Sequence, residues 1–151
     1  MIHMPNTWRA PAAIVAGSLG ILASWYVVLY GGPHTNIEVA DLWLGETDTQ
    51  RAAFHGTIAN RGVNGDRLVR IASNLANKVA IFDHEGREIE NLRIRADAEL
   101  VFGGGSLRME AIGLQRPIKA NESFPLLLVF ERTGKVWVNA QVRAVRNVGW
   151  E

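Results

Sequence analysis

Side chains that could do chemistry are few in this sequence. The four histidines, His3, His34, His55 and His84, are scattered along the chain. None has a second histidine or a carboxylate at a zinc-enzyme spacing such as H-E-x-x-H. Cysteine is absent, which excludes disulfides, thiolate metal sites and cysteine nucleophiles from the sequence. The histidine and cysteine patterns therefore predict no metalloenzyme centre.

Serine and glycine patterns give no catalytic signal either. Ser73, Ser106 and Ser123 lack the G-x-S-x-G setting of a nucleophile elbow. The glycine run at 103–105 lacks the G-K-[ST] ending of a phosphate-binding loop, so we interpret it as a tight connection between strands. We therefore expect no catalytic residues, and the protein is predicted not to be an enzyme.

The charge balance excludes a polyanion as a general partner. Lys plus Arg is 16 and Asp plus Glu is 15, which gives a formal net charge of +1. A field this weak does not gather nucleic acid, so no nucleic-acid partner is predicted. The mixed charges between residues 85 and 99 are typical of a solvated sheet face rather than of a specific docking patch.

The elements that position these residues read as strands from residue 37 onward. Short runs rich in apolar and β-branched residues are separated by turn formers such as Asn60-Arg61-Gly62 and Thr133-Gly134. Residues 135–142 alternate with period two, as expected for a strand with one face on a core and the other in water. The predicted strands are 37–44, 53–59, 67–73, 78–82, 88–94, 100–102, 107–114, 126–131 and 135–142. This pattern predicts an all-β sandwich or barrel.

The residues before the strands predict a membrane anchor. Residues 12–30 carry no ionisable group other than tyrosine phenols, and as a helix they would be about 29 Å long, close to the thickness of a bilayer core. A cleaved signal peptide is the first alternative, but Trp25, Tyr26 and Tyr30 stand where small residues would precede cleavage. A buried helix is the second alternative, although one small core rarely hides a helix that is apolar on every face. We expect an uncleaved transmembrane helix over 12–30, in contact with the lipid bilayer.

Flanking charges predict the orientation of this helix. Arg9 precedes the span, and the first charged residues after it are Glu38 and Asp41. The positive-inside rule then places the N-terminus in the cytoplasm. For a bacterial source, the expected location is the inner membrane, with the C-terminal domain in the periplasm.

One face of the predicted helix carries small side chains at a spacing of four, namely Ala12, Ala16, Gly20 and Ser24. Such faces let helix backbones approach closely in lipid, which predicts a partner helix. Chance explains the stripe equally well, because alanine and glycine are frequent in membrane spans.

The strand region resembles the PCu(A)C family of periplasmic copper chaperones over about residues 37–143. Four segments carry the resemblance in order: 37–43 (IEVADLW), 57–82 (TIANRGVNGDRLVRIASNLANKVAIF), 113–119 (GLQRPIK) and 124–134 (FPLLLVFERTG). The resemblance implies a cupredoxin-like Greek-key β-sandwich, in agreement with the strand pattern. It also implies a surface Cu(I) site made by two histidines and two methionines, for delivery of copper to cytochrome oxidase during its assembly.

This sequence departs from the family at each ligand position. By the resemblance, the first histidine falls on Phe82, and the H-x-M pair falls on Arg108 and Glu110. The other methionine has no counterpart, since no methionine occurs between residues 5 and 108. Met109 alternates with its two neighbours in a strand, so we expect it in the core. No metal site and no cofactor are predicted, and Phe82, Arg108 and Glu110 become a candidate docking surface.

Two functions from different classes follow from this pattern. The first is a non-catalytic, single-pass accessory subunit that binds integral membrane subunits of a redox or photosynthetic complex. The alternative is a membrane-tethered copper chaperone with a rearranged Cu(I) site that uses His84, His55 or N-terminal residues. The expected organisation is a cytoplasmic segment at 1–11, a transmembrane helix at 12–30, a linker at 31–36, a β-sandwich at 37–143 and a tail at 144–151.

Overall fold

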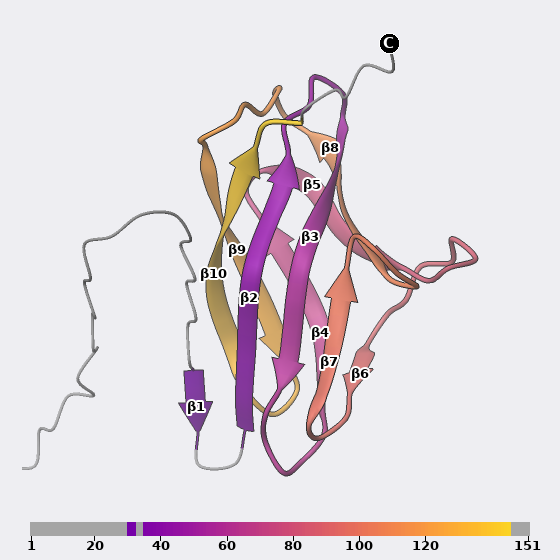
Figure 1. Cartoon of the computed structure of the whole chain (residues 1–151), viewed down its shortest axis with the longest axis vertical. Helices are drawn as coiled ribbons and strands as arrows, with labels where there is room; N and C mark the ends of the chain where they lie inside the picture. Colours follow the sequence, from indigo (N-terminus) through magenta and orange to yellow (C-terminus); the bar gives the residue numbers. More distant parts are fainter. Residues whose placement is uncertain (1–29, 33–34, 146–151) are drawn as a thin grey trace, which may run out of the picture.

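The computed structural model describes residues 30–32 and 35–145, and every regular element in them is a β-strand (Figure 1). The strands are β1 (Tyr30–Gly32), β2 (Thr35–Gly45), β3 (Arg51–Asn60), β4 (Asp66–Ser73), β5 (Ala76–Phe82), β6 (Leu92–Ile94), β7 (Ala98–Phe102), β8 (Arg108–Leu114), β9 (Ser123–Phe130) and β10 (Gly134–Arg143). The prediction of an all-β domain is confirmed.

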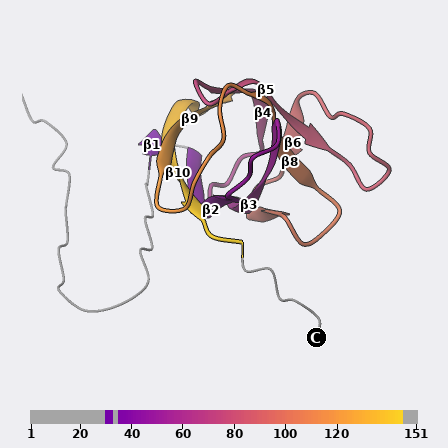
Figure 2. The same cartoon turned by 90° about the horizontal axis from the view of Figure 1, so that it is seen from above.

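The strands form one sheet that curls round on itself. Its order is β5-β8-β3-β2-β10-β9-β4-β6, with β1 added to β2 and β7 added to β3. Only the β2–β10 pair is parallel, and it joins Trp43–Gly45 to Gln141–Arg143. Viewed along the strands, β8 and β3 lie on one side of the curled sheet and β9 and β10 on the opposite side, so their outer faces point away from each other (Figure 2).

The core fills the space inside the curled sheet. Its largest fully buried side chains include Phe54, Phe102, Phe130 and Met109. The predicted core position of Met109 is therefore confirmed. The predicted alternation is also confirmed, because every second residue of β10 from Val136 to Val142 is buried and the residues between them are exposed.

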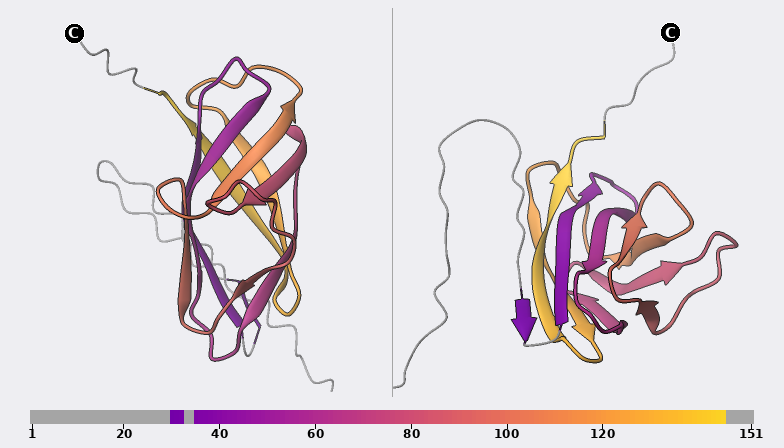
Figure 3. Two further views of the ribbon diagram at one scale, coloured as in Figure 1. Left: turned by 90° about the vertical axis from the view of Figure 1, so that its right-hand side faces the viewer. Right: turned by 60° about the horizontal axis from the view of Figure 1, so that its bottom comes forward.

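A bulge in β2 decides which strands its two halves contact. Asp41 has a φ of 48°, and the pairing with β3 shifts register between Ala40 and Trp43. Gly56 lies opposite with a φ of 141°, and a Cβ there would sit 2.9 Å from the Asp41 carbonyl oxygen. Glycine is thus required at this crossing. Before the bulge β2 pairs with β1, and after it β2 pairs in parallel with β10, so β1 and the start of β10 lie at the same end of the sandwich (Figure 3).

The end of the sandwich at which β2, β4 and β10 begin is held together by two buried polar residues. Asn60 is fully buried, and its Nδ2 donates to the carbonyl oxygens of Asn64 at 2.8 Å and Ile94 at 3.3 Å. Its Oδ1 accepts from the backbone N–H of Gly62 at 3.0 Å. The Asn60-x-Gly62 piece thus has a structural role in closing the β3–β4 turn.

Asp66 joins this end to the β9–β10 turn. Its carboxylate, in a residue only 4% exposed, accepts from the backbone N–H groups of Arg67 (2.7 Å), Arg132 (2.9 Å) and Thr133 (3.0 Å) and from the Thr133 hydroxyl (2.6 Å). Burial raises the pKa of Asp66, but the Thr133 hydroxyl and the three backbone donors outweigh it and lower the pKa below the ordinary value of 3.8. The carboxylate is therefore ionised at neutral pH.

The predicted anchor falls almost entirely outside the residues that the structure describes. The span at 12–30, its small residues Ala12, Ala16, Gly20 and Ser24, and most of the tail lie outside the described residues, except that Tyr30 begins β1. The predicted linker at 31–36 contributes its first two residues to β1 and its last two to β2. Within residues 30–32 and 35–145, no helix has the length and apolarity needed to cross a membrane.

Candidate functional site

Three neighbouring strands bring the predicted surface residues together. β8 lies between β5 and β3, and Phe82 of β5 pairs with Arg108 of β8. Glu110 follows Arg108 on the same face and pairs with Ala80 of β5 and Ala53 of β3. The three residues expected at the family's ligand positions therefore form one surface on the outer side of the sheet.

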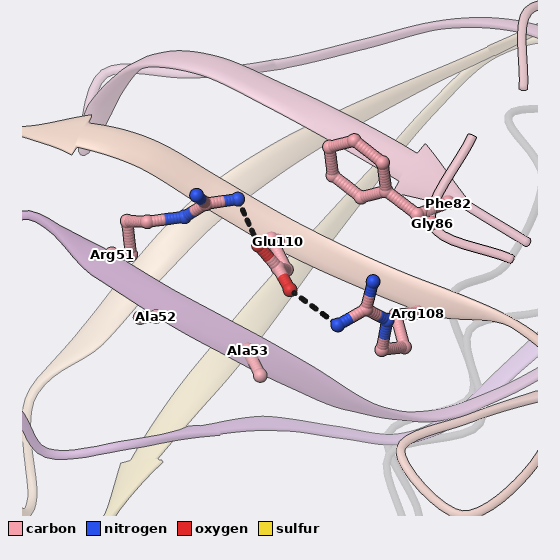
Figure 4. A pocket seen from close by; sticks show the side chains of 7 residues that line it. All are labelled: Arg51, Ala52, Ala53, Phe82, Gly86, Arg108 and Glu110. Carbon is pink, nitrogen blue, oxygen red and sulfur yellow. Dashed lines mark hydrogen bonds and ion pairs between the residues drawn. The ribbon is translucent and has the colours of Figure 1, made fainter. Parts of the chain in front are cut away.

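An arginine that the sequence did not single out completes this surface. Arg51 begins β3, and its Nη2 lies 2.5 Å from Oε2 of Glu110, while Nη1 of Arg108 lies 3.5 Å from Oε1 (Figure 4). The Glu110 side chain is 14% exposed, whereas the two arginines are 60% and 54% exposed. Each carboxylate oxygen thus faces its own guanidinium, and we call Arg51, Phe82, Arg108 and Glu110 the docking surface.

The docking surface borders an open pocket of about 570 Å³, whose lining also includes Ala52, Ala53 and Gly86. The Arg108 guanidinium lies 5.9 Å from the centre of the Phe82 ring, within the range of a cation–π contact. Figure 4 shows the Glu110 carboxylate between the two arginines, with the Phe82 ring beside Arg108. Arginine and aromatic side chains are enriched among the residues that dominate protein interfaces, so this composition suits recognition of another protein.

The loop after Phe82 is ordered by its own first residue. Asp83 Oδ1 accepts from the backbone N–H groups of Glu85 and Arg87, each at 2.9 Å, and Oδ2 lies 2.9 Å from Nε of Arg87. The Arg87 backbone N–H is the main cause that lowers the pKa of Asp83, helped by the Arg87 side chain and the Glu85 N–H against the opposing effect of burial. This loop places Gly86 at the rim of the pocket.

His84 and His55, the histidines of the alternative copper site, do not come together as a metal site in the structure. His84 is exposed in the loop, with Nε2 3.6 Å from a carboxylate oxygen of Glu85. His55 instead stacks on Trp43, with ring centres 4.1 Å apart and an angle of 11° between the planes. Among the residues that the structure describes, no group of three or more His, Cys, Asp and Glu could hold a metal ion.

The docking surface does not fit Cu(I) either. Cuprous ion prefers thioether, thiolate and imidazole donors. A phenyl ring has no donor atom, and guanidinium groups are permanently cationic and repel a metal ion. The only carboxylate already faces two arginines. These side chains therefore do not offer a donor set for Cu(I), and their composition suits a polar and aromatic protein contact.

Sequence reasoning found Phe82, Arg108 and Glu110 but missed Arg51 and Gly86. Arg51 and Glu110 are 59 positions apart in the chain and meet because Arg51 and Ala53 of β3 face Ile112 and Glu110 of β8. No local spacing carries that information. A charged residue at the start of a strand is the only signal, and it is common to many solvated strands.

Comparisons with known proteins agree on the domain type. The model of the LpqE-like family, described as lipoprotein LpqE-like, matches residues 37–142. No curated protein sequence matches the chain.

Solved structures of PCuAC domains share the fold. The apo PCuAC domain from PmoF1 has a TM-score of 0.66 and 20% identity over 72% of this chain and 94% of its own. The copper-bound PCuAC domain from PmoF2 has a TM-score of 0.65 and 20% identity over 72% and 93%. The solution structure of CuI-DR1885 from Deinococcus radiodurans has a TM-score of 0.61 and 21% identity over 77% and 80%.

The predicted cupredoxin-like sandwich is thereby confirmed, and so is the resemblance to the copper-chaperone domains. The family match covers more than half of the sequence, and the chain belongs to the LpqE-like family, with a domain of the PCuAC copper-chaperone fold.

Proposed function

We propose that the protein is a non-catalytic, single-pass accessory subunit of an energy-transducing membrane complex, either respiratory or photosynthetic. The apolar segment at 12–30 anchors it in a bacterial inner membrane, and the β-domain sits on the periplasmic side. The domain binds other subunits of the complex through the docking surface. It carries no copper of its own.

One observation carries this proposal. The residues at the family's expected ligand positions are Phe82, Arg108 and Glu110, and they lie together with Arg51 as an ion-paired, aromatic surface without a Cu(I) donor set. The domain that carries them has the fold of PCuAC domains, with TM-scores of 0.66 and 0.65 to two of them. A PCuAC fold whose surface at these positions offers no Cu(I) donors supports a role in binding rather than in metal delivery.

The anchor in this proposal is a helix rather than a lipid. The family description names lipoproteins, whose lipid is a diacylglycerol joined to a cysteine sulfur by a thioether, but this sequence contains no cysteine. The apolar run at 12–30 supplies a span of about 29 Å in its place. The stripe from Ala12 to Ser24 offers a face for a neighbouring helix.

The experiment is gentle detergent extraction of the tagged full chain from its native membrane, followed by mass spectrometry of co-migrating polypeptides. We expect partners at a fixed ratio to the wild-type chain. Arg108→Glu reverses a charge on the docking surface and is expected to lower partner recovery at least about tenfold, as for a central interface residue. Lys119→Glu makes the same change of charge on the exposed loop between β8 and β9 and is the matched control.

A wild-type chain that runs alone contradicts the proposal. Equal loss of partners in Arg108→Glu and Lys119→Glu contradicts the assignment of the docking surface. Thermal unfolding of both variants, measured alongside, separates a lost contact from a lost fold.

The second candidate is a membrane-tethered copper chaperone with a rearranged site. Two structural neighbours favour it, because one is a copper-bound PCuAC domain and the other is the Cu(I) form of DR1885. A competition titration of the full chain with Cu(I) tests it, with His55→Ala and His84→Ala as variants. Binding tighter than about micromolar that is lost in either variant supports this candidate, and its absence removes it.

A further inference from the structure

β9 is apolar on both faces, which is unusual for a strand with one face in solvent. Leu126, Leu128 and Phe130 point into the core, while Leu127 and Val129 point outward and are only half-buried. An antiparallel sheet normally alternates apolar residues inside with polar residues outside. The outer face of β9 therefore has the composition of a covered surface.

The neighbouring strands extend this apolar strip. Leu127 pairs with Ala72 of β4 and with Trp137 of β10, and Trp137 is 54% exposed. The next row joins Val129 to Arg70 and Lys135, and Val69 beside Arg70 is 40% exposed. The strip thus crosses three strands near the end at which β2 begins.

Cations flank the strip at the end of the sandwich where β4 and β10 begin. Arg67 pairs with Arg93 of β6 across the sheet, and with Arg70 and Lys135 they give four exposed cations on this face. Glu131, 3.4 Å from Arg67, is the one exposed acidic residue among the described residues of these strands and the β9–β10 turn, since Asp66 of β4 is buried. A surplus of three positive charges on one face is large for a chain whose formal net charge is +1. We call this face, with Val69, Val129, Leu127 and Trp137, the basic face.

The basic face lies where a membrane anchor would bring it close to lipid. β1 shares Tyr30 with the apolar segment at 12–30 and pairs with the first residues of β2, at the end of the sandwich where β10 begins and carries Lys135 and Trp137 (Figure 1). The docking surface is on the outer face of β3, β8 and β5, and β3 and β8 lie across the curled sheet from β9 and β10 (Figure 2). Contact through the basic face therefore leaves the docking surface free for a partner.

We propose that the basic face rests on the surface of an anionic lipid bilayer. This inference rests on the anchor in the proposed function. Anionic headgroups attract arginine and lysine side chains near the surface, and tryptophan is enriched at the level of the headgroups. A protein partner would need to supply acidic groups around an apolar patch, whereas an anionic bilayer supplies headgroup charge and apolar depth together.

The test uses the full chain in nanodiscs. Because the sequence has no natural cysteine, a spin label attaches only at the cysteine that a variant introduces. Asn139→Cys places a spin label on the exposed side of β10, in the row after Trp137. Ala53→Cys places the same label on the docking side. Nanodiscs of phosphatidylcholine alone are compared with nanodiscs that contain about one third phosphatidylglycerol. The rate of collision between each spin label and a water-soluble nickel relaxant reports how far the label is shielded from water by the bilayer.

We expect the nickel accessibility of the label at 139 to fall at least about threefold in the anionic nanodiscs, with no change at 53. Lys135→Glu should reverse most of this protection, while Lys119→Glu, the same change on an exposed loop, should leave it unchanged. Protection of both labels or of neither overturns the proposal. Protection that appears only when native membrane proteins are added assigns the face to a protein partner and also overturns it.

The same preparation separates the two proposals. A chain that does not remain with nanodiscs during size-exclusion chromatography refutes the anchor and thereby both proposals. A chain that stays in the disc with the label at 139 open to water refutes the basic face alone and leaves the anchored subunit standing.

Discussion

Asp66 offers the sharpest prediction about how this sandwich is held together. Its carboxylate accepts four hydrogen bonds, from the N–H groups of Arg67, Arg132 and Thr133 and from the Thr133 hydroxyl. Replacing it with alanine leaves three backbone donors without their acceptor at a nearly buried position. A buried donor without an acceptor costs about 1 to 3 kcal/mol, so loss of the acceptor for three donors in Asp66→Ala should cost about 3 to 9 kcal/mol. That is a large part of the typical stability of a domain, about 5 to 15 kcal/mol.

The same carboxylate predicts a dependence of stability on pH. The pKa of Asp66 is lower in the folded chain than its ordinary value of 3.8, so the unfolded chain binds the proton more tightly. The contribution of Asp66 to stability is therefore complete above pH 3.8 and is lost as the pH falls through the folded pKa. Asp66→Asn has no carboxyl to titrate and should show a shallower loss of stability below pH 4 than the wild type.

Urea denaturation of the wild type, Asp66→Ala and Asp66→Asn at neutral and acidic pH measures both effects. Asp48→Asn is the control, since Asp48 is an exposed carboxylate in the turn between β2 and β3. A cost below about 1 kcal/mol for Asp66→Ala, or an acid slope in Asp66→Asn equal to that of the wild type, would refute the assigned role of Asp66.

Three further predictions concern the docking surface and the core beneath it. The combined variant Phe82→His, Arg108→His and Glu110→Met places imidazole and thioether donors at the positions where the family resemblance puts the copper ligands. It should bind Cu(I) at least about tenfold more tightly than the wild type in a competition titration. Equal affinities would contradict the assignment of those positions. Arg51→Gln should change the unfolding free energy by less than about 1 kcal/mol, because its contact with Glu110 is made by an exposed guanidinium, and a larger loss in urea denaturation would show that the pair supports the fold. Met109→Ala should cost about 2 to 5 kcal/mol because Met109 is fully buried, and a smaller loss by the same measurement would place it outside the packed core.

Much of the fold could be predicted from the sequence because its signals are local. The alternation in residues 135–142 directly reports the inward and outward faces of β10. Turn formers such as Asn60-Arg61-Gly62 mark where strands end. β1 was missed because its three residues follow an apolar run and contain two glycines, which carry little strand signal.

The candidate site could be predicted only in part, because it depends on register between distant strands. Arg108 and Glu110 share a face by alternation within one strand, which the sequence shows. The contact of Arg51 with Glu110 depends on how β3 aligns with β8, which local spacing does not encode. The basic face was missed for the same reason, since the charges near residues 85 to 99 were interpreted as a solvated face, and Arg93 meets Arg67 only through the pairing of β6 with β4.

The central claim is that this domain binds subunits of a membrane complex without carrying copper. Gentle extraction of the full chain from its native membrane, with mass spectrometry and metal analysis of the same chromatographic peak, tests it most directly. The account predicts co-migration at a fixed ratio with oxidase, cytochrome or reaction-centre polypeptides and no copper that depends on this chain. A chain that migrates alone with bound copper would contradict it.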